Sequence, residues 1–102
     1  IPELQIQESY FQELVPGEEG GNSYLVLSVI PANNETKLII EAEVLGDRIL
    51  LKRQGDRYTG LCPETLKFVE GEVLQLKLKY SWNGEFNWHA SQAMVKEPLF
   101  MP

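Results

Sequence analysis

The chain of 102 residues is poor in the side chains from which catalytic and metal sites are usually built. It has one cysteine, Cys62, one histidine, His89, and two aspartates, Asp47 and Asp56. A lone cysteine cannot form an internal disulfide or a cysteine-based zinc site. Both aspartates follow a glycine in a predicted hairpin turn, where Asp has a structural role, so neither is placed for a Ser-His-Asp triad. We therefore predict a domain that is not an enzyme and has no metal or cofactor.

Long apolar runs and an excess of basic residues are missing as well. No run approaches the ~20 apolar residues of a membrane-spanning helix, so we expect no membrane span. Residues 1–36 contain six glutamates and no lysine or arginine, and the chain has a net charge of −6. Such a chain lacks the basic surface by which proteins bind nucleic acids. The acidic first third serves solubility or meets a cation or a basic partner.

The residues that are present form a pattern of short strands within one domain, residues 1–102. Hydrophobic residues make up 43% of the chain, which excludes intrinsic disorder. Two Gly-Asp-Arg triplets, at residues 46–48 and 55–57, separate apolar-rich runs at residues 38–45, 49–53 and 58–62. Glycine at the first central position suits a type II′ hairpin turn. This stretch therefore predicts an antiparallel three-stranded meander.

Two-residue turns at both triplets would fix the register of this meander. Leu45 would pair with Arg48, and Gln54 with Arg57. Two core-facing rows follow: Val44, Ile49 and Cys62 in one, and Ala42, Leu51 and Gly60 in the next. On the polar outer face Glu41 would lie directly opposite Lys52. Cys62 is thereby predicted to be a buried apolar side chain rather than a nucleophile.

Alternation and turn residues predict the remaining elements. We expect strands over residues 3–13, 24–30, 73–82 and 86–95. Residues 63–71 would form a short helical or irregular crossover that packs Leu66, with Phe68 or Val69, against one end of the core. About seven short strands predict a small all-β antiparallel β-sandwich, of which the immunoglobulin-like arrangement is one form. A partly open β-barrel is the alternative.

The closing hairpin has two competing registers. A two-residue loop would place Tyr80 opposite Asn87 and Leu78 opposite His89, which mixes apolar and polar side chains on each face. A three-residue turn, Trp82-Asn83-Gly84 with Gly84 in the left-handed region, pairs Tyr80 with Phe86 and Leu78 with Trp88. We predict this second register, with a G1 bulge, because it places the large apolar side chains on the core face.

Four residues at this turn form a candidate ligand or partner patch: Tyr80, Trp82, Asn83 and Glu85. Trp82 lies within the proposed turn, so the core needs it less than the other aromatic residues. An exposed tryptophan beside polar side chains is typical of sugar-binding and protein-binding surfaces. The alternative is that Trp82 caps an open end of the sandwich.

Three segments resemble a group of small, uncharacterised secreted or lipoprotein-like proteins of the Bacteroidetes. They are Tyr10-Phe11-Gln12-Glu13 followed by Gly17, Gly20 and Gly21; Tyr58-Thr59-Gly60; and Lys96-Glu97-Pro98-Leu99-Phe100-Met101-Pro102. The resemblance implies an extracytoplasmic location, whether periplasmic, anchored at the outer membrane or secreted. It also implies a lipid anchor on a cysteine upstream of Ile1, and it brings no activity or site residues.

The sequence thus predicts a non-enzymatic binding or structural domain of an exported bacterial protein, with a protein or glycan partner at the cell envelope. A carbohydrate-binding accessory module centred on an exposed Trp82 is the alternative.

Overall fold

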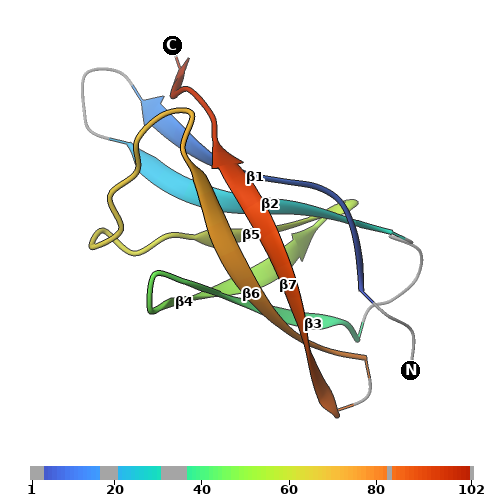
Figure 1. Ribbon diagram of the computed structural model, residues 1–102. Helices are drawn as coiled ribbons and strands as arrows, with labels where there is room; N and C mark the ends of the chain where they lie inside the picture. The colour runs from blue at the N-terminus through green and yellow to red at the C-terminus, as the bar shows by residue number, and fades with distance from the viewer. Residues whose placement is uncertain (1–3, 17–20, 31–36, 83, 102) are drawn as a thin grey trace.

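The described part of the chain consists of β-strands and their connections (Figure 1). The computed structural model describes residues 4–16, 21–30, 37–82 and 84–101, and no helix occurs among them. The strands are β1 (Gln5–Pro16), β2 (Asn22–Ile30), β3 (Ile39–Val44), β4 (Asp47–Gln54), β5 (Arg57–Leu61), β6 (Val73–Ser81), β7 (Phe86–Val95) and β8 (Leu99–Met101). The predicted all-β class is confirmed.

The sheet closes into a seven-stranded barrel, so the predicted sandwich, including its immunoglobulin-like form, is wrong. The strand order is β2-β5-β4-β3-β6-β7-β1, and β1 pairs with β2 to complete the circle. A sandwich needs separate sheet edges, but β1 has neighbours on both sides. It pairs antiparallel with β2, and parallel with β7 and then with the short strand β8. The barrel that had been the alternative is therefore the architecture of the molecule.

Alternate residues of β3, β4 and β6 fill the barrel interior. On β6 these are Leu74, Leu76, Leu78 and Tyr80, all of them buried. The other large side chains that are almost fully buried are Leu4, Phe11, Leu25, Leu27, Ile40, Val44 and Ile49. Each side chain of this size contributes about 1.5–3 kcal/mol when it is removed from water, so this interior is the main source of stability.

The second turn of the central meander has the predicted register. Gln54 pairs with Arg57, and Lys52 pairs with Thr59. Gly55 has a φ of +65°, as the first central residue of a type II′ turn requires. Cys62 is buried, as predicted from this register.

The first turn of the meander is shifted by two residues from the prediction. Val44 pairs with Asp47 rather than Ile49, and Ala42 pairs with Ile49. The reason is that Leu45 takes a φ of +50° and Gly46 a φ of +85°, which makes them the two central residues of a type I′ turn. A shift of two keeps each side chain on its predicted face, so the core face is correct although the rows are not.

The same shift changes the outer face of the meander. Glu41 lies opposite Leu50, not Lys52. Its carboxylate instead lies 3.6 Å from the guanidinium of Arg48, at the neighbouring position of β4. The predicted direct pair of carboxylate and ammonium is therefore wrong.

The connection from β5 to β6 is irregular rather than helical. The N–H of Leu66 donates to the carbonyl of Pro63 at 3.1 Å, which forms one turn. Leu66 is buried, and the Phe68 ring lies 4.6 Å from the Phe11 ring between centroids. The prediction that this crossover packs against the core is confirmed for Leu66 and Phe68, whereas Val69 is exposed.

Candidate functional site

The register of the β6–β7 hairpin differs from the prediction. Ser81 pairs with Phe86, and Lys79 pairs with Trp88. The loop is one residue longer than the predicted three-residue turn, so the proposed pairing of Tyr80 with Phe86 is wrong. Tyr80 pairs with Asn87 and Leu78 with His89, which is the register that had been rejected together with the two-residue loop. Gly84 does have a positive φ, +96°, and its N–H donates to Ser81 Oγ at 2.7 Å. Asn83 lies outside the described residues.

This register reverses the expected orientation of β7. Phe86 and Trp88 point away from the barrel interior, with 49% and 52% of their surfaces exposed. The residues that alternate with them, Asn87, His89 and Ser91, are half-buried on the inner side. His89 therefore lies opposite Leu78 on the inner side.

Two lysines of β6 lie over these exposed rings. Lys77 Nζ lies 4.3 Å from the centroid of the Trp88 ring, and Lys79 Nζ lies 4.7 Å from that of Phe86. Among the described residues neither ammonium has a carboxylate within ion-pair distance. Such cation–π contacts contribute about 0.5–1 kcal/mol at exposed sites, and they orient the rings. We call Phe86, Trp88, Lys77 and Lys79 the aromatic face.

The three described residues of the predicted patch, Tyr80, Trp82 and Glu85, do not form one exposed surface. Tyr80 is only 4% exposed, and its hydroxyl accepts the N–H of Leu4 at 3.3 Å. Trp82 is half-buried and packs against the core, while Glu85 is exposed. The exposed aromatic surface of the hairpin therefore comes from Phe86 and Trp88, whose outward orientation the sequence reasoning missed.

Two buried polar groups at this end of the molecule have no hydrogen-bond partner among the described residues. They are Trp82 Nε1 and Asn87 Nδ2, and both are donors. A buried donor without an acceptor costs about 1–3 kcal/mol. Asn87 belongs to the inner side of β7.

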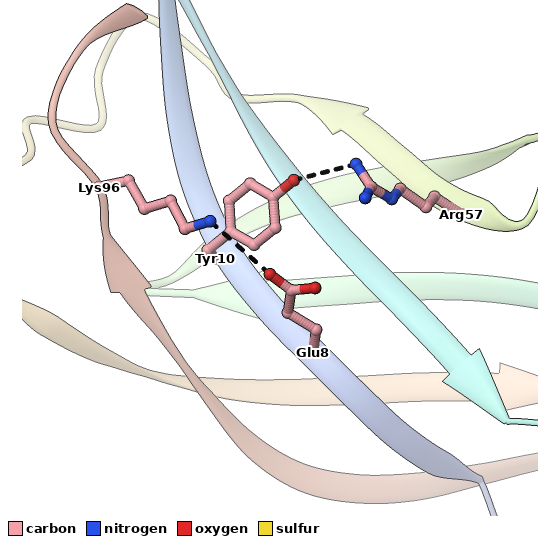
Figure 2. Close-up of polar contacts among 4 residues, drawn as sticks. All are labelled: Glu8, Tyr10, Arg57 and Lys96. Atoms are coloured by element: carbon pink, nitrogen blue, oxygen red, sulfur yellow. Dashed lines mark hydrogen bonds and ion pairs between the residues drawn. The ribbon is translucent and has the colours of Figure 1, made fainter.

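A cluster of four residues holds β1 where the barrel closes (Figure 2). The ammonium of Lys96, which follows β7, lies 3.7 Å from the centroid of the Tyr10 ring and 3.6 Å from Glu8 Oε1. On the other side of β1, Arg57 Nη1 donates to the Tyr10 hydroxyl at 3.3 Å. The cluster thus links the middle of β1 to strands on both sides, which is a structural role.

A cleft of about 530 Å³ lies near the β5–β6 connection. Its apolar lining includes Phe11, Cys62, Leu66 and Phe68, and its charged lining consists of Glu13, Glu64, Lys67, Glu70 and Lys96. Burial raises the pKa of the Cys62 thiol to about 12, so the thiol stays protonated at neutral pH and is a poor nucleophile. Among the described residues no group of three or more His, Cys, Asp or Glu side chains is placed to hold a metal ion.

Comparisons with known proteins do not assign the chain to a family. No family model matches it, and no curated protein or solved structure matches it significantly. The resemblance to exported Bacteroidetes proteins therefore stays a prediction. No helix among the described residues is long and apolar enough to cross a membrane.

Proposed function

We propose that the chain is a non-catalytic binding domain of an exported bacterial protein and that it binds a protein partner through the aromatic face. The observation that carries the proposal is the orientation of β7, which exposes Phe86 and Trp88 while Asn87, His89 and Ser91 point inward. The opposite orientation would remove more apolar surface from water, at about 1.5–3 kcal/mol for each large side chain. Aromatic residues exposed at such a cost are typical of interaction surfaces.

Further exposed apolar side chains lie on the same side of the sheet as the aromatic face. Ile39 of β3 pairs with Ser81 beside Phe86, and Val73 pairs with Met94 at the far end of the hairpin. All three of these apolar side chains, Ile39, Val73 and Met94, are about half exposed. Glu41 and Glu43 of β3 are the cross-strand neighbours of the two lysines, and Gln75 and Gln92 lie between Trp88 and the Val73–Met94 pair. Exposed aromatic side chains among charged and polar residues suit a protein partner, because interface centres are enriched in aromatic residues.

A glycan is the second candidate partner, and the exposed ring of Trp88 is the observation that favours it. The aliphatic face of a sugar can stack on such a ring. Trp82, on which the sequence had centred this alternative, packs against the core and offers less open ring surface. For either partner we propose the cell envelope as the location, on the basis of the sequence resemblance alone.

Binding screens against envelope proteins and glycans would test the proposal. We expect Trp88→Ala and Phe86→Ala to weaken binding of the partner found with the wild type by at least about tenfold while the melting temperature changes little. Leu50→Ala is the matched control, because Leu50 is an exposed apolar residue on β4. A partner whose affinity for the Trp88 and Phe86 variants equals that for the wild type would contradict the proposal.

A further inference from the structure

Most of β7 has a strand neighbour on one side only. Within the described residues, β7 pairs with β6 from Phe86 to Met94 but with β1 only at Met94 and Val95. Figure 1 shows β1 turning away from β7 below this short contact. Residues 86–91 therefore have no strand of the described part of the chain beside them on the side that faces β1. We call this side the free edge of β7.

The structure shows why the pairing with β1 stops. Ser9 Oγ donates to the carbonyl of Gln92. The ammonium of Lys96 lies over the ring of the next residue, Tyr10 (Figure 2). On the other side of this point, the register of β1 against β2 shifts between Ile6 and Glu8. Such a bulge bends a strand, and here β1 continues along β2 without following β7. The free edge is thus built into the barrel.

The residues of the free edge are not of the types by which proteins protect unpaired strands. Edge strands usually carry lysine or proline, or are kept very short. Residues 86–91 read Phe-Asn-Trp-His-Ala-Ser, with no proline, lysine, arginine or acid. Unprotected backbone N–H and C=O groups of this kind are a template for another strand.

The two sides of the free edge indicate the side chains that an added strand would carry. Phe86 and Trp88 on the outer side favour β-branched or aromatic cross-strand neighbours. The nearby ammonium groups of Lys77 and Lys79 favour a carboxylate on the same side. On the inner side, the unpartnered amide of Asn87 favours a small hydrogen-bond acceptor.

We infer that the free edge of β7 binds an extended segment of the partner protein by strand addition. Side chains of this segment alternate between the two sides of the sheet. Those on the outer side are apolar or acidic, and those on the inner side are small hydrogen-bond acceptors such as Ser, Asn or Asp. Backbone hydrogen bonds to residues 86–91 provide the register, and contacts with the aromatic face provide specificity. The inference rests on the proposed binding function and names the form in which its partner binds.

Selection from a phage-displayed library of random linear nine-residue peptides tests the inference. Enriched peptides are synthesised, and amide hydrogen exchange of the isotope-labelled chain is followed with and without each peptide. We expect those backbone amides of residues 86–91 that point to the free edge to exchange at least about tenfold more slowly in the complex. Proline substitutions at alternate peptide positions should weaken binding at least about tenfold, because proline removes a backbone donor.

A pair of charge variants sharpens the test. Ala90→Lys places a protecting charge on the free edge at an exposed position, and we expect it to weaken peptide binding by at least about tenfold. Leu50→Lys adds the same charge to β4, which has neighbours on both sides, and should leave peptide affinity unchanged.

The outcomes separate this inference from the proposed function. Peptides that need Trp88 but leave the edge amides unprotected would overturn strand addition and keep the aromatic face as the binding surface. Peptides that protect the edge equally well in Trp88→Ala would support strand addition and contradict the role of the aromatic face. Failure to enrich any peptide would overturn the inference, as would edge protection that appears without peptide as the chain concentration rises, since a second copy would then be the occupant.

Discussion

β6 and β7 are the two strands of one hairpin and both alternate, yet they turn opposite kinds of side chain inward. β6 buries its leucines and Tyr80 and exposes Gln75 and Lys77. β7 turns Asn87 and His89 inward and exposes Trp88 on the outer side. Alternation shows that a strand has two different faces, but only its neighbours decide which face meets the core.

The kind of side chain that β7 turns inward also changes along the strand, according to whether β1 lies beside it. Where β1 pairs with β7, the inward residues are apolar and buried, as Ala93 and Val95 show at 1% and 8% exposure. Where β1 is absent, the inward residues are polar and half-buried. The part of β7 with polar inward residues is therefore the part with the free edge. Phe86 and Trp88 alternate with these polar residues and so point outward.

Substituting an aspartate on each strand should give the largest difference in the free energy of unfolding between β6 and β7. Leu78→Asp places a carboxylate in the barrel core without a partner, and we expect it to lower the free energy of unfolding by about 4 kcal/mol or more. Trp88→Asp changes an outward position and should alter it by about 1 kcal/mol or less. Urea denaturation measures both values, and similar losses in the two variants would show that Trp88 is in the core.

The two tryptophans give a smaller contrast. Trp82 packs against the core, so Trp82→Ala should lower the free energy of unfolding by about 1–3 kcal/mol. Trp88→Ala should change it by about 0.5 kcal/mol or less, because the ring is half exposed. The reverse order of losses in thermal or urea unfolding would restore Trp82 as the surface tryptophan.

Thiol reactivity compares the closed part of the interior with the inner side of β7. Cys62 is buried and its pKa is raised to about 12, so it should react slowly with a thiol reagent in the native state and rapidly in urea. A cysteine introduced by Ser91→Cys, in a Cys62→Ala background, should react in the native state. Equal rates at both positions would mean that the inner side of β7 is as closed as the rest of the core.

The same thiol gives a pH effect with a defined sign. The pKa is raised in the folded state, while the unfolded thiol titrates near its ordinary value of about 8.5. Between these two values the unfolded chain loses the proton and the folded chain keeps it, so stability falls as pH rises above about 8.5 and is unaffected below it. Cys62→Ala should show a smaller loss of stability over this range in urea titrations at increasing pH. An unchanged pH dependence in that variant would contradict the raised pKa.

Local sequence patterns predicted much of the fold and little of the candidate site. The turn at Gly55 and the core face of the meander followed from glycine chemistry and alternation. The turn at Leu45 could not be predicted in this way, because a leucine with a φ of +50° is rare and no sequence pattern indicates it. Barrel closure could not be predicted either, since it depends on a two-residue parallel contact between the distant strands β1 and β7.

The site was misplaced for a related reason. Large aromatic residues were assumed to face the core, which selected a three-residue turn and put Phe86 inside. The polar residues between them, Asn87, His89 and Ser91, fit an inner side that has no second neighbour, but nothing in the sequence shows that β1 leaves β7 there. The exposed pair, Phe86 and Trp88, thus became visible only from the register of the whole sheet.

Fluorescence quenching of Trp88 tests the outward orientation of β7 most directly. Trp82→Phe leaves Trp88 as the one tryptophan of the chain, and Trp88→Phe leaves Trp82. With acrylamide as quencher, the outward register predicts a clearly larger quenching constant for Trp88 than for Trp82, near that of a solvent-exposed indole. A Trp88 quenched no more than Trp82, with emission typical of a buried ring, would contradict the outward register and the binding surface built on it.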